Sequence, residues 1–267
     1  MPLGSGLPIS NLEVCKAKSV KLLGSLIEAD ELTLRERDAM FRLMDETFAN
    51  VHRDAFDADL AAKDWVIRVH DPESRKLVGF STQVLLGPAT LDADVRVLYS
   101  GDTVVERQHW GDVALAHVWG RLALDLMDSY GDEPLYWFLT SKGFRTYRYL
   151  PMFFKEWFPR SGRATPAYER QLIDVLGGHL APRRYDCRTQ VIRAGGGKDF
   201  VRPGISDPVG RAASDEHVRY FLERNPRYDR GDELCCLAPL TRENFTRAAY
   251  RVIEAAPRPS TSEACLP

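Results

Sequence analysis

The chain has 267 residues, of which 44% are hydrophobic and 28% are charged, and its formal net charge is -2. A chain of this length and composition can bury a sizeable core, as one large domain or two small ones. The small negative charge excludes a general electrostatic attraction to nucleic acid, which needs a basic excess or a segregated basic face. We therefore expect a globular protein with no nucleic-acid partner.

The cysteines and the apolar runs indicate the cellular compartment and whether a metal or a membrane is involved. The five cysteines form no C-x-x-C pair, so neither a disulfide framework nor a zinc site is indicated. The N-terminus has no signal-peptide pattern, and no apolar run approaches the roughly 18 residues of a membrane-spanning helix. We expect a cytoplasmic protein with no membrane span and no metal.

The first half of the chain predicts a helix followed by a β-hairpin. Thr33 and Glu36 have the spacing of a capping box, which predicts that a helix begins here and extends over residues 34–50. Residues 64–70 and 76–86 are rich in β-branched or alternating apolar side chains, and an Asp-Pro turn joins them. They predict two antiparallel strands.

Residues 95–105 predict a third strand, and Gly101 within it indicates a bulge or a close approach of another backbone. A long amphipathic helix over about 112–130 follows, because apolar side chains recur at three- and four-residue steps. Residues 135–140 then predict a further strand. This order of strand, glycine turn, helix and strand is the most informative feature of the sequence.

The remaining segments predict further helices and one strand. Ser141 is suited to cap a short helix that Pro151 interrupts. A second helix is expected to begin at Pro166 and to end at the Gly177-Gly178 pair, and residues 233–238 predict a strand.

The order of these elements resembles the GCN5-related N-acetyltransferase (GNAT) superfamily. The resemblance implies an α/β fold with a mixed, mostly antiparallel central sheet flanked by helices, and a C-terminal α/β extension. It divides the chain into an N-terminal segment over 1–18, an acyltransferase core over 19–160, an extension over 161–256 that packs on the core, and a disordered tail over 257–267.

In the GNAT pattern, an Arg or Gln is followed after two residues by Gly, and after one more by Gly or Ala, and the amides of this turn hold the pyrophosphate of coenzyme A. Gln108 and Gly111 match the pattern, while Val113 stands where the second small residue is expected unless Ala114 takes its place. The resemblance thus implies a cofactor site at the following backbone positions: Thr103, Val104, Val105, Gln108, Gly111, Asp112, Val113 and Ala114.

Asp112 departs from the pattern, because a carboxylate at this helix end repels a pyrophosphate if it points inward. Two unit charges about 5 Å apart at an effective dielectric near 20 repel by roughly 3 kcal/mol. This departure motivates the hypothesis that the donor is an acyl group on a carrier protein, whose phosphopantetheine has a single phosphodiester. Arg145, Arg148 and Arg160 would then form a basic surface for an acidic acyl carrier protein.

Acyl transfer to an amine needs an oxyanion donor, a base for the amine proton and an acid for the leaving thiolate. Backbone amides near Thr103 suit the first role, and Asp102, beside the expected bulge, is our candidate base. The resemblance implies a tyrosine early in the helix after the 135–140 strand as the acid, and Tyr147 is its nearest match, with Tyr149 second.

The sequence thus predicts an enzyme that moves an acyl group from a pantetheine thioester, on acyl-CoA or an acyl carrier protein, to an amine of a small metabolite. Two alternatives remain open at this point. One is a GNAT-like fold without transfer activity that acts as a binding or regulatory module. The other is hydrolysis or cyclisation of a carrier-bound thioester in a biosynthetic pathway.

Overall fold

The computed structural model describes residues 22–91, 94–205, 212 and 214–254. The expected segment 1–18 and tail 257–267 lie outside these residues. Within them, a mixed eight-stranded sheet has the strand order β1-β3-β4-β5-β6-β10-β8-β7. The bounds of these strands are β1 Leu23–Glu28, β3 Trp65–His70, β4 Leu77–Leu86, β5 Arg96–Val105, β6 Leu135–Ser141, β7 Tyr185–Asp186, β8 Val191–Ile192 and β10 Glu233–Pro239.

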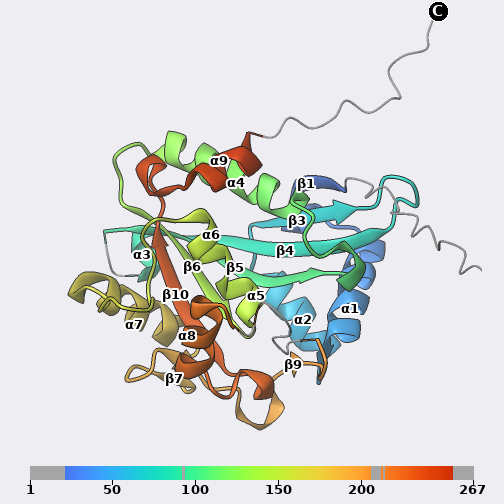
Figure 1. Ribbon diagram of the computed structural model, residues 1–267. Helices are drawn as coiled ribbons and strands as arrows, with labels where there is room; N and C mark the ends of the chain where they lie inside the picture. The colour runs from blue at the N-terminus through green and yellow to red at the C-terminus, as the bar shows by residue number, and fades with distance from the viewer. Residues whose placement is uncertain (1–21, 92–93, 206–211, 213, 255–267) are drawn as a thin grey trace, which may run out of the picture.

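Helices cover both faces of the sheet (Figure 1). On one face lie α4 and α9, and on the other lie α1 and α2. The helices of the described residues are α1 Leu34–Thr47, α2 Arg53–Leu60, α3 Pro88–Leu91, α4 Ala114–Tyr130, α5 Phe144–Tyr147, α6 Tyr149–Phe153, α7 Ala167–Leu180, α8 Glu216–Arg224 and α9 Arg247–Ile253. The expected fold class, a mostly antiparallel sheet flanked by helices with an α/β extension, is confirmed.

The local signals near the N-terminus are confirmed. The Thr33 hydroxyl accepts a hydrogen bond from the Glu36 N–H, and the Glu36 carboxylate accepts one from the Thr33 N–H, so both ends of the capping box are in place. The hairpin of β3 and β4 forms as expected. Our sequence analysis missed β1 and α2, which are short and lack a strong periodic pattern.

Two predicted helix boundaries are wrong. Ser141 is the last residue of β6, and its hydroxyl donates to the carbonyl of Gly143, so it caps no helix. The Gly177-Gly178 pair lies inside α7, which continues to Leu180. Gly177 is required there by packing, because a Cβ atom at this position would lie 2.2 Å from the ring of Tyr185.

The extension completes the sheet as well as packing on it. Strand β10 pairs antiparallel with β6 from Leu234↔Ser141 to Pro239↔Tyr136. A second, two-stranded sheet joins β2 (Phe48–Ala49) to β9 (Phe200–Val201), and so ties the extension to the segment after α1. The extension therefore contacts both faces of the sheet, with β9 beside β2 on the face that α1 and α2 cover and α9 packed on α4 on the other face.

A bulge in β5 decides the geometry at the centre of the sheet. Ser81 pairs with Thr103 and Gln83 pairs with Ser100, so two residues of β5, Gly101 and Asp102, face the single residue Thr82 of β4. A Cβ atom on Gly101 would lie 2.6 Å from the Thr82 hydroxyl oxygen. The glycine in the strand pattern is thus explained by a close approach of β4 at a bulge.

Strands β5 and β6 are parallel neighbours for only part of their length. They pair from Arg96↔Leu135 to Ser100↔Leu139, after which β5 continues beside β4 while β6 continues beside β10. Parallel strands that separate leave backbone N–H and C=O groups without a ladder partner on the facing edges. We call this separation the β5–β6 opening.

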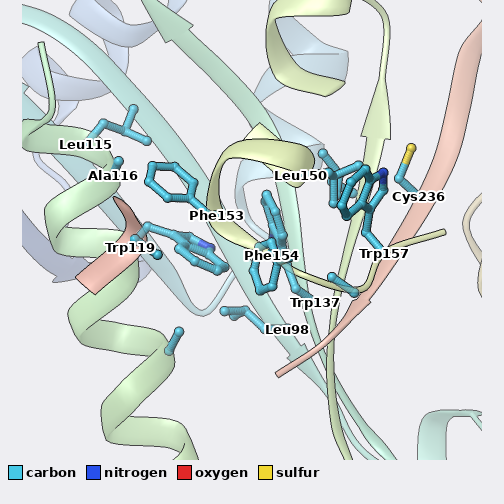
Figure 2. Packing of buried hydrophobic residues seen from close by; sticks show 14 of the residues in the cluster. Leu98, Leu115, Ala116, Trp119, Trp137, Leu150, Phe153, Phe154, Trp157 and Cys236 are labelled. Atoms are coloured by element: carbon cyan, nitrogen blue, oxygen red, sulfur yellow. The ribbon is translucent and has the colours of Figure 1, made fainter. Parts of the chain in front are cut away.

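Aromatic side chains from α4, β6 and α6 fill the core beside this opening. The Trp119 and Trp137 ring centroids are 4.5 Å apart, and Phe154 packs against both. Figure 2 shows Phe153 directed from α6 towards Leu115 and Ala116 of α4. Packed aromatic rings hold the start of α4 at a set distance from the opening.

We expect Gly120→Ala to destabilise the protein, because its Cβ atom would lie 2.3 Å from Cγ1 of Ile253, where α9 packs on α4. Overpacking of this kind costs about 1–3 kcal/mol of unfolding free energy, measured by urea denaturation. The control is Gly178→Ala in α7, where an added Cβ atom would meet nothing within 4 Å beyond the adjacent residues and backbone of its own helix, and a gain of about 0.5–1 kcal/mol is expected. A stabilised Gly120→Ala protein would contradict the α4–α9 packing.

Candidate functional site

Two cavities meet at the β5–β6 opening, one on each face of the sheet. The α2-side cavity has a volume of about 220 Å³ and lies between α2, β5, β6 and the segment before β9. The α4-side cavity is smaller, about 40 Å³, and lies beside the start of α4 and α6. Both cavities are lined by the same set of residues at the opening, namely Gly101, Thr103, Thr140 and Thr146.

Asp102, the predicted base, lines the α2-side cavity. The bulge directs it there, and among the described residues its carboxylate has no hydrogen-bond or ion-pair partner. Burial raises the pKa of Asp102 to about 6, while the nearby Lys142 charge acts to lower it and the Asp59 charge to raise it. A partly buried carboxylate with this pKa is mostly ionised at pH 7 and can still accept a proton.

Lys142 lines the same cavity and was missed by our sequence analysis. Its ammonium group forms an ion pair with Asp199 and lies 3.2 Å from a carboxylate oxygen of Glu233. These two carboxylates belong to the C-terminal extension, so the extension contributes directly to the wall of the cavity. The only sequence signal for Lys142 was its place at the end of a strand pattern, which did not indicate its partners.

Tyr149 lines the α4-side cavity, together with Phe153, on which its ring stacks at a centroid distance of 5.6 Å. Burial raises the pKa of Tyr149, so its hydroxyl remains protonated at neutral pH. Within the described chain this hydroxyl has no hydrogen-bond partner. It is therefore available to a molecule in the cavity.

Tyr147, our first candidate for the acid, lies elsewhere. Its side chain is fully buried, and its hydroxyl donates a hydrogen bond of 2.8 Å to the carbonyl of Pro159. Neither cavity is lined by Tyr147. Because the hydroxyl proton of Tyr147 is hydrogen-bonded to a backbone carbonyl, a structural role is favoured. The aromatic pattern of the sequence alone did not distinguish Tyr147 from Tyr149.

A chain of buried side-chain hydrogen bonds crosses the sheet beneath the α4-side cavity. Trp137 Nε1 donates to Ser100 Oγ at 2.9 Å, and Ser100 Oγ donates to Gln83 Oε1 at 2.6 Å. Gln83 Nε2 donates to Ser81 Oγ at 2.8 Å, and Ser81 Oγ lies 2.7 Å from Thr103 Oγ1.

An indole N–H can only donate, which sets the direction of this chain as far as Ser81. Ser81 accepts from Gln83, and either hydroxyl of the Ser81–Thr103 pair can donate to the other. The Thr103 hydroxyl also lies 3.4 Å from the carbonyl oxygen of Gly101, which can accept its proton. Thr103 lines both cavities, and a hydroxyl at this position can donate a hydrogen bond to a bound molecule or accept one from it.

The other two predicted cofactor residues on β5, Val104 and Val105, line neither of these two cavities. Val104 is buried in the core on the α1 side. The carbonyl of Val105 accepts a hydrogen bond of 2.9 Å from Trp110 Nε1. Of the three, only Thr103 lines the cavities.

The glycine turn forms where expected, and Gly111 has a left-handed φ of 97°. The Asp112 carboxylate points inward. One of its oxygens accepts a hydrogen bond of 2.7 Å from the Ala114 N–H at the start of α4, and the other accepts one of 3.4 Å from the Leu22 N–H. The Ala114 N–H is thus already bonded, and a negative charge already lies at this helix end.

The remaining residues of the turn lie at the surface. Gln108 is exposed, and its amide donates to Glu106 at 2.9 Å, while Val113 is 44% exposed and precedes α4. The first turn of α4 retains N–H groups without intrahelical partners, and two of its residues, Leu115 and Ala116, line the α4-side cavity.

The three arginines of the expected carrier surface differ in their partners. Arg148 lies 3.4 Å from a carboxylate oxygen of Asp215, and Arg160 lies 3.6 Å from one of Glu156. The Arg145 guanidinium lies over Trp110, with 4.0 Å from Cζ to the ring centroid. Arg145 alone of the three has no carboxylate partner among the described residues.

The described residues lack both a membrane-spanning helix and a metal-binding cluster. No helix there is both long enough and apolar enough to cross a membrane. No group of three or more His, Cys, Asp or Glu side chains in that part of the chain could hold a metal ion.

We expect Ser100→Ala to lower the unfolding free energy by about 1–3 kcal/mol, because it leaves Trp137 Nε1 and Gln83 Oε1 buried without partners. Urea denaturation measures the change. The control is Ser129→Ala, in which an exposed hydroxyl bonded to its own helix is removed and a change within about 0.5 kcal/mol is expected. Equal effects of the two substitutions would contradict the hydrogen-bond chain.

No family model and no curated protein sequence matches the chain. Among solved structures, it is similar to an acyl-CoA N-acyltransferase from Pseudomonas aeruginosa, with 19% identity, a TM-score of 0.34, and coverage of 46% of this chain and 80% of that one. It is also similar to an aminoglycoside acetyltransferase from an uncultured soil metagenomic sample, with 13% identity, a TM-score of 0.32, and coverage of 45% and 77%.

A third similar structure is glucosamine-6-phosphate N-acetyltransferase from Arabidopsis thaliana, with 13% identity, a TM-score of 0.34, and coverage of 54% of this chain and 98% of that one. Because these TM-scores are below 0.5, the likeness carries no substrate or residue role to this chain. The first of the three is an N-acyltransferase, and the other two are acetyltransferases.

Proposed function

We propose that the protein transfers an acyl group from a pantetheine thioester to the amine of a small molecule. The observation that carries the proposal is the meeting of two cavities at the β5–β6 opening, with Asp102 in one and Tyr149 in the other. Two substrates that enter from opposite faces of the sheet would meet at the shared residues. This arrangement suits a reaction between two molecules that must be held in line.

The α4-side cavity is the proposed site of the thioester. The edge of β5 beyond Ser100 has no β6 partner, so its backbone groups are available to the amides of a pantetheine arm. The thioester carbonyl would lie near Thr103, where N–H groups of the strand and the Thr103 hydroxyl can stabilise a developing oxyanion. The aromatic rings of Trp119, Trp137 and Phe153 give this cavity an apolar wall.

The α2-side cavity is the proposed site of the amine. Four carboxylates line it, and two of them, Asp199 and Glu233, are paired with Lys142. Asp59 is paired with Lys63 at 2.8 Å. Asp102 therefore remains as the carboxylate that can receive an ammonium group and then take its proton.

The reaction balances with these groups alone. The amine nitrogen forms a bond to the thioester carbon, and its extra proton passes to Asp102, directly or through water. The carbon–sulfur bond breaks with its electron pair on sulfur, and the thiolate takes the proton of the Tyr149 hydroxyl. The proton on Asp102 is released to solvent, and Tyr149 regains a proton before the next turnover.

The position of Asp112 favours a particular donor. A carboxylate bonded at the start of α4 opposes a pyrophosphate at the same place. A donor with one phosphodiester, acyl-phosphopantetheine on a carrier protein, meets less of this repulsion than acyl-CoA does. We therefore propose the carrier protein as the preferred donor, and acyl-CoA as the alternative.

The basic experiment incubates the protein with acyl-CoA or an acyl carrier protein and a mixture of amines, and measures released thiol and product mass. Thiol release with an N-acyl product is expected. A product that contains water in place of the amine would indicate hydrolysis. Binding of a donor without thiol release would indicate a binding module, and failure to bind any pantetheine species would refute the proposal.

We expect Asp102→Asn to lower kcat/KM by about 10²–10⁴-fold, because the amide cannot take the amine proton. In the unmodified protein the rate should rise with pH through about 6, since Asp102 accepts a proton only when ionised. This step should be absent from the pH–rate profile of the variant.

The matched control is Asp59→Asn. The Asp59 charge raises the pKa of Asp102, so its removal should move the inflection to lower pH. An Asp102→Asn protein with an unchanged inflection and a loss below about tenfold would exclude Asp102 as the base.

We expect Tyr149→Phe to lower kcat by about 100-fold with an alkyl thioester donor, because the ring stack on Phe153 is kept while the proton donor is lost. The loss should shrink with an aryl thioester, whose thiolate leaves without protonation. Tyr147→Phe is the comparison, and it should lower stability by about 1 kcal/mol through the lost bond to Pro159. A greater loss of kcat in Tyr147→Phe than in Tyr149→Phe would return the acid role to Tyr147.

A further inference from the structure

Two arginines share one indole ring at the outer end of the β5–β6 opening. Arg145 Cζ lies 4.0 Å from the Trp110 ring centroid, and Arg107 Cζ lies 5.7 Å from it. Trp110 follows β5 and Arg145 follows β6, so the Arg145–Trp110 contact spans the ends of the two strands that have separated. The indole Nε1–H of Trp110 donates a hydrogen bond to the Val105 carbonyl, which fixes the ring against the end of β5.

These two cations have no counter-ion in the described part of the chain. Neither Arg107 nor Arg145 forms an ion pair there, although both are exposed. Burial of its stem, and then the charges of Arg107 and Arg148, lower the pKa of Arg145. Like charges held together on a rigid aromatic surface are stabilised when an anion binds between them.

There is space for a ligand group beside Arg107 and Trp110. These two residues line an open hollow of about 560 Å³, whose wall also includes Leu43 and Thr47 of α1. Arg145 does not line this hollow but lies over the Trp110 ring that does. Glu46 and Glu106 also line it, and Glu106 is neutralised by Lys76 at 2.6 Å. We call Arg107, Trp110 and Arg145 the arginine–tryptophan cluster.

The cluster and the start of α4 both carry groups that attract an anion near the opening. At the start of α4, the Asp112 carboxylate already accepts a hydrogen bond from the Ala114 N–H. The cluster, by contrast, presents two guanidinium groups, each able to donate paired hydrogen bonds to phosphate oxygens. Electrostatics therefore favours the cluster over the helix end.

We propose that the arginine–tryptophan cluster binds the phosphate group at the outer end of the pantetheine arm. The inference rests on the proposed function, which places the thioester near Thr103 and directs the arm outward along the free edge of β5. The recognised group is the phosphate itself, which 4′-phosphopantetheine on a carrier protein and coenzyme A have in common.

The test compares pantetheine with 4′-phosphopantetheine, which differ only by the phosphate, in isothermal titration calorimetry on the full chain. The unmodified protein should bind 4′-phosphopantetheine at least about tenfold more tightly than pantetheine. Arg145→Gln and Arg107→Gln should each reduce this ratio by about three- to tenfold, while the affinity for pantetheine changes less than about twofold.

The matched control is Arg96→Gln. Arg96 also stacks on an aromatic ring, with its Cζ 4.1 Å from the Tyr130 centroid, but it is paired with Glu133 at the far end of β5. Its substitution should leave the ratio unchanged. The comparison of the two ligands on the unmodified protein is informative even if a variant does not fold.

The failures of the two proposals are distinguishable. If pantetheine binds and the phosphate adds no affinity, the cluster proposal fails and the proposed function stands. If neither ligand binds, both fail. If Asp112→Asn strengthens the phosphate effect while both arginine variants leave it unchanged, the phosphate lies at the start of α4 and the cluster proposal is overturned.

Two further binding measurements distinguish coenzyme A from a carrier protein as the molecule that supplies the phosphate. Equal losses in Arg145→Gln with coenzyme A and with a carrier protein bearing 4′-phosphopantetheine support recognition of the shared group. A loss confined to the carrier protein, with free 4′-phosphopantetheine unaffected, would place Arg145 against the acidic surface of the carrier and overturn the proposal.

Discussion

The site depends on the separation of two parallel strands in the middle of a sheet. β5 and β6 keep their ladder up to the Ser100↔Leu139 pair, and the bulge at Gly101 and Asp102 then holds β5 against β4 while β6 follows β10. Strand edges inside a protein are costly when their polar groups are left unpaired. The separation therefore creates a place in the interior where a ligand with amide groups can complete the pairing.

The bulge also determines which chemistry lies on each face of the sheet. It directs Asp102 to the α2-side cavity, while Ser100 and Thr103 belong to the hydrogen-bond chain under the α4-side cavity. The other carboxylates around Asp102 are ion-paired, Asp199 and Glu233 with Lys142 and Asp59 with Lys63. Burial then raises the pKa of the one unpaired carboxylate, which gives a base suited to neutral pH.

Anion recognition follows the same electrostatic reasoning. Asp112 stabilises the start of α4 from within the protein, and this removes a position where the helix could attract a phosphate. Arg107 and Arg145, which lie over Trp110, form no ion pair among the described residues. Asp112 departs from the GNAT glycine-turn pattern and disfavours a phosphate at the start of α4. The arginine–tryptophan cluster supplies positive charge at the outer end of the opening instead.

The sequence by itself determined the elements with strong local signals. The capping box at Thr33, the β3–β4 hairpin, the bulge at Gly101 and the helix after Gly111 all follow from side-chain periodicity or backbone freedom within a few residues. Asp102 could be singled out because the bulge that positions it is itself a local signal.

Only the tertiary structure decided what depends on residues far apart in the chain. Lys142 meets Asp199 and Glu233 across 57 and 91 positions, and no local pattern relates them. The choice between Tyr147 and Tyr149 depends on where Pro159 lies, and the direction of Asp112 depends on Leu22 and the start of α4. The periodicity of apolar residues in the sequence indicates which face of a helix or strand is buried. The partner of a buried polar group depends on packing between elements, because the neighbouring element supplies the opposite charge or the hydrogen bond.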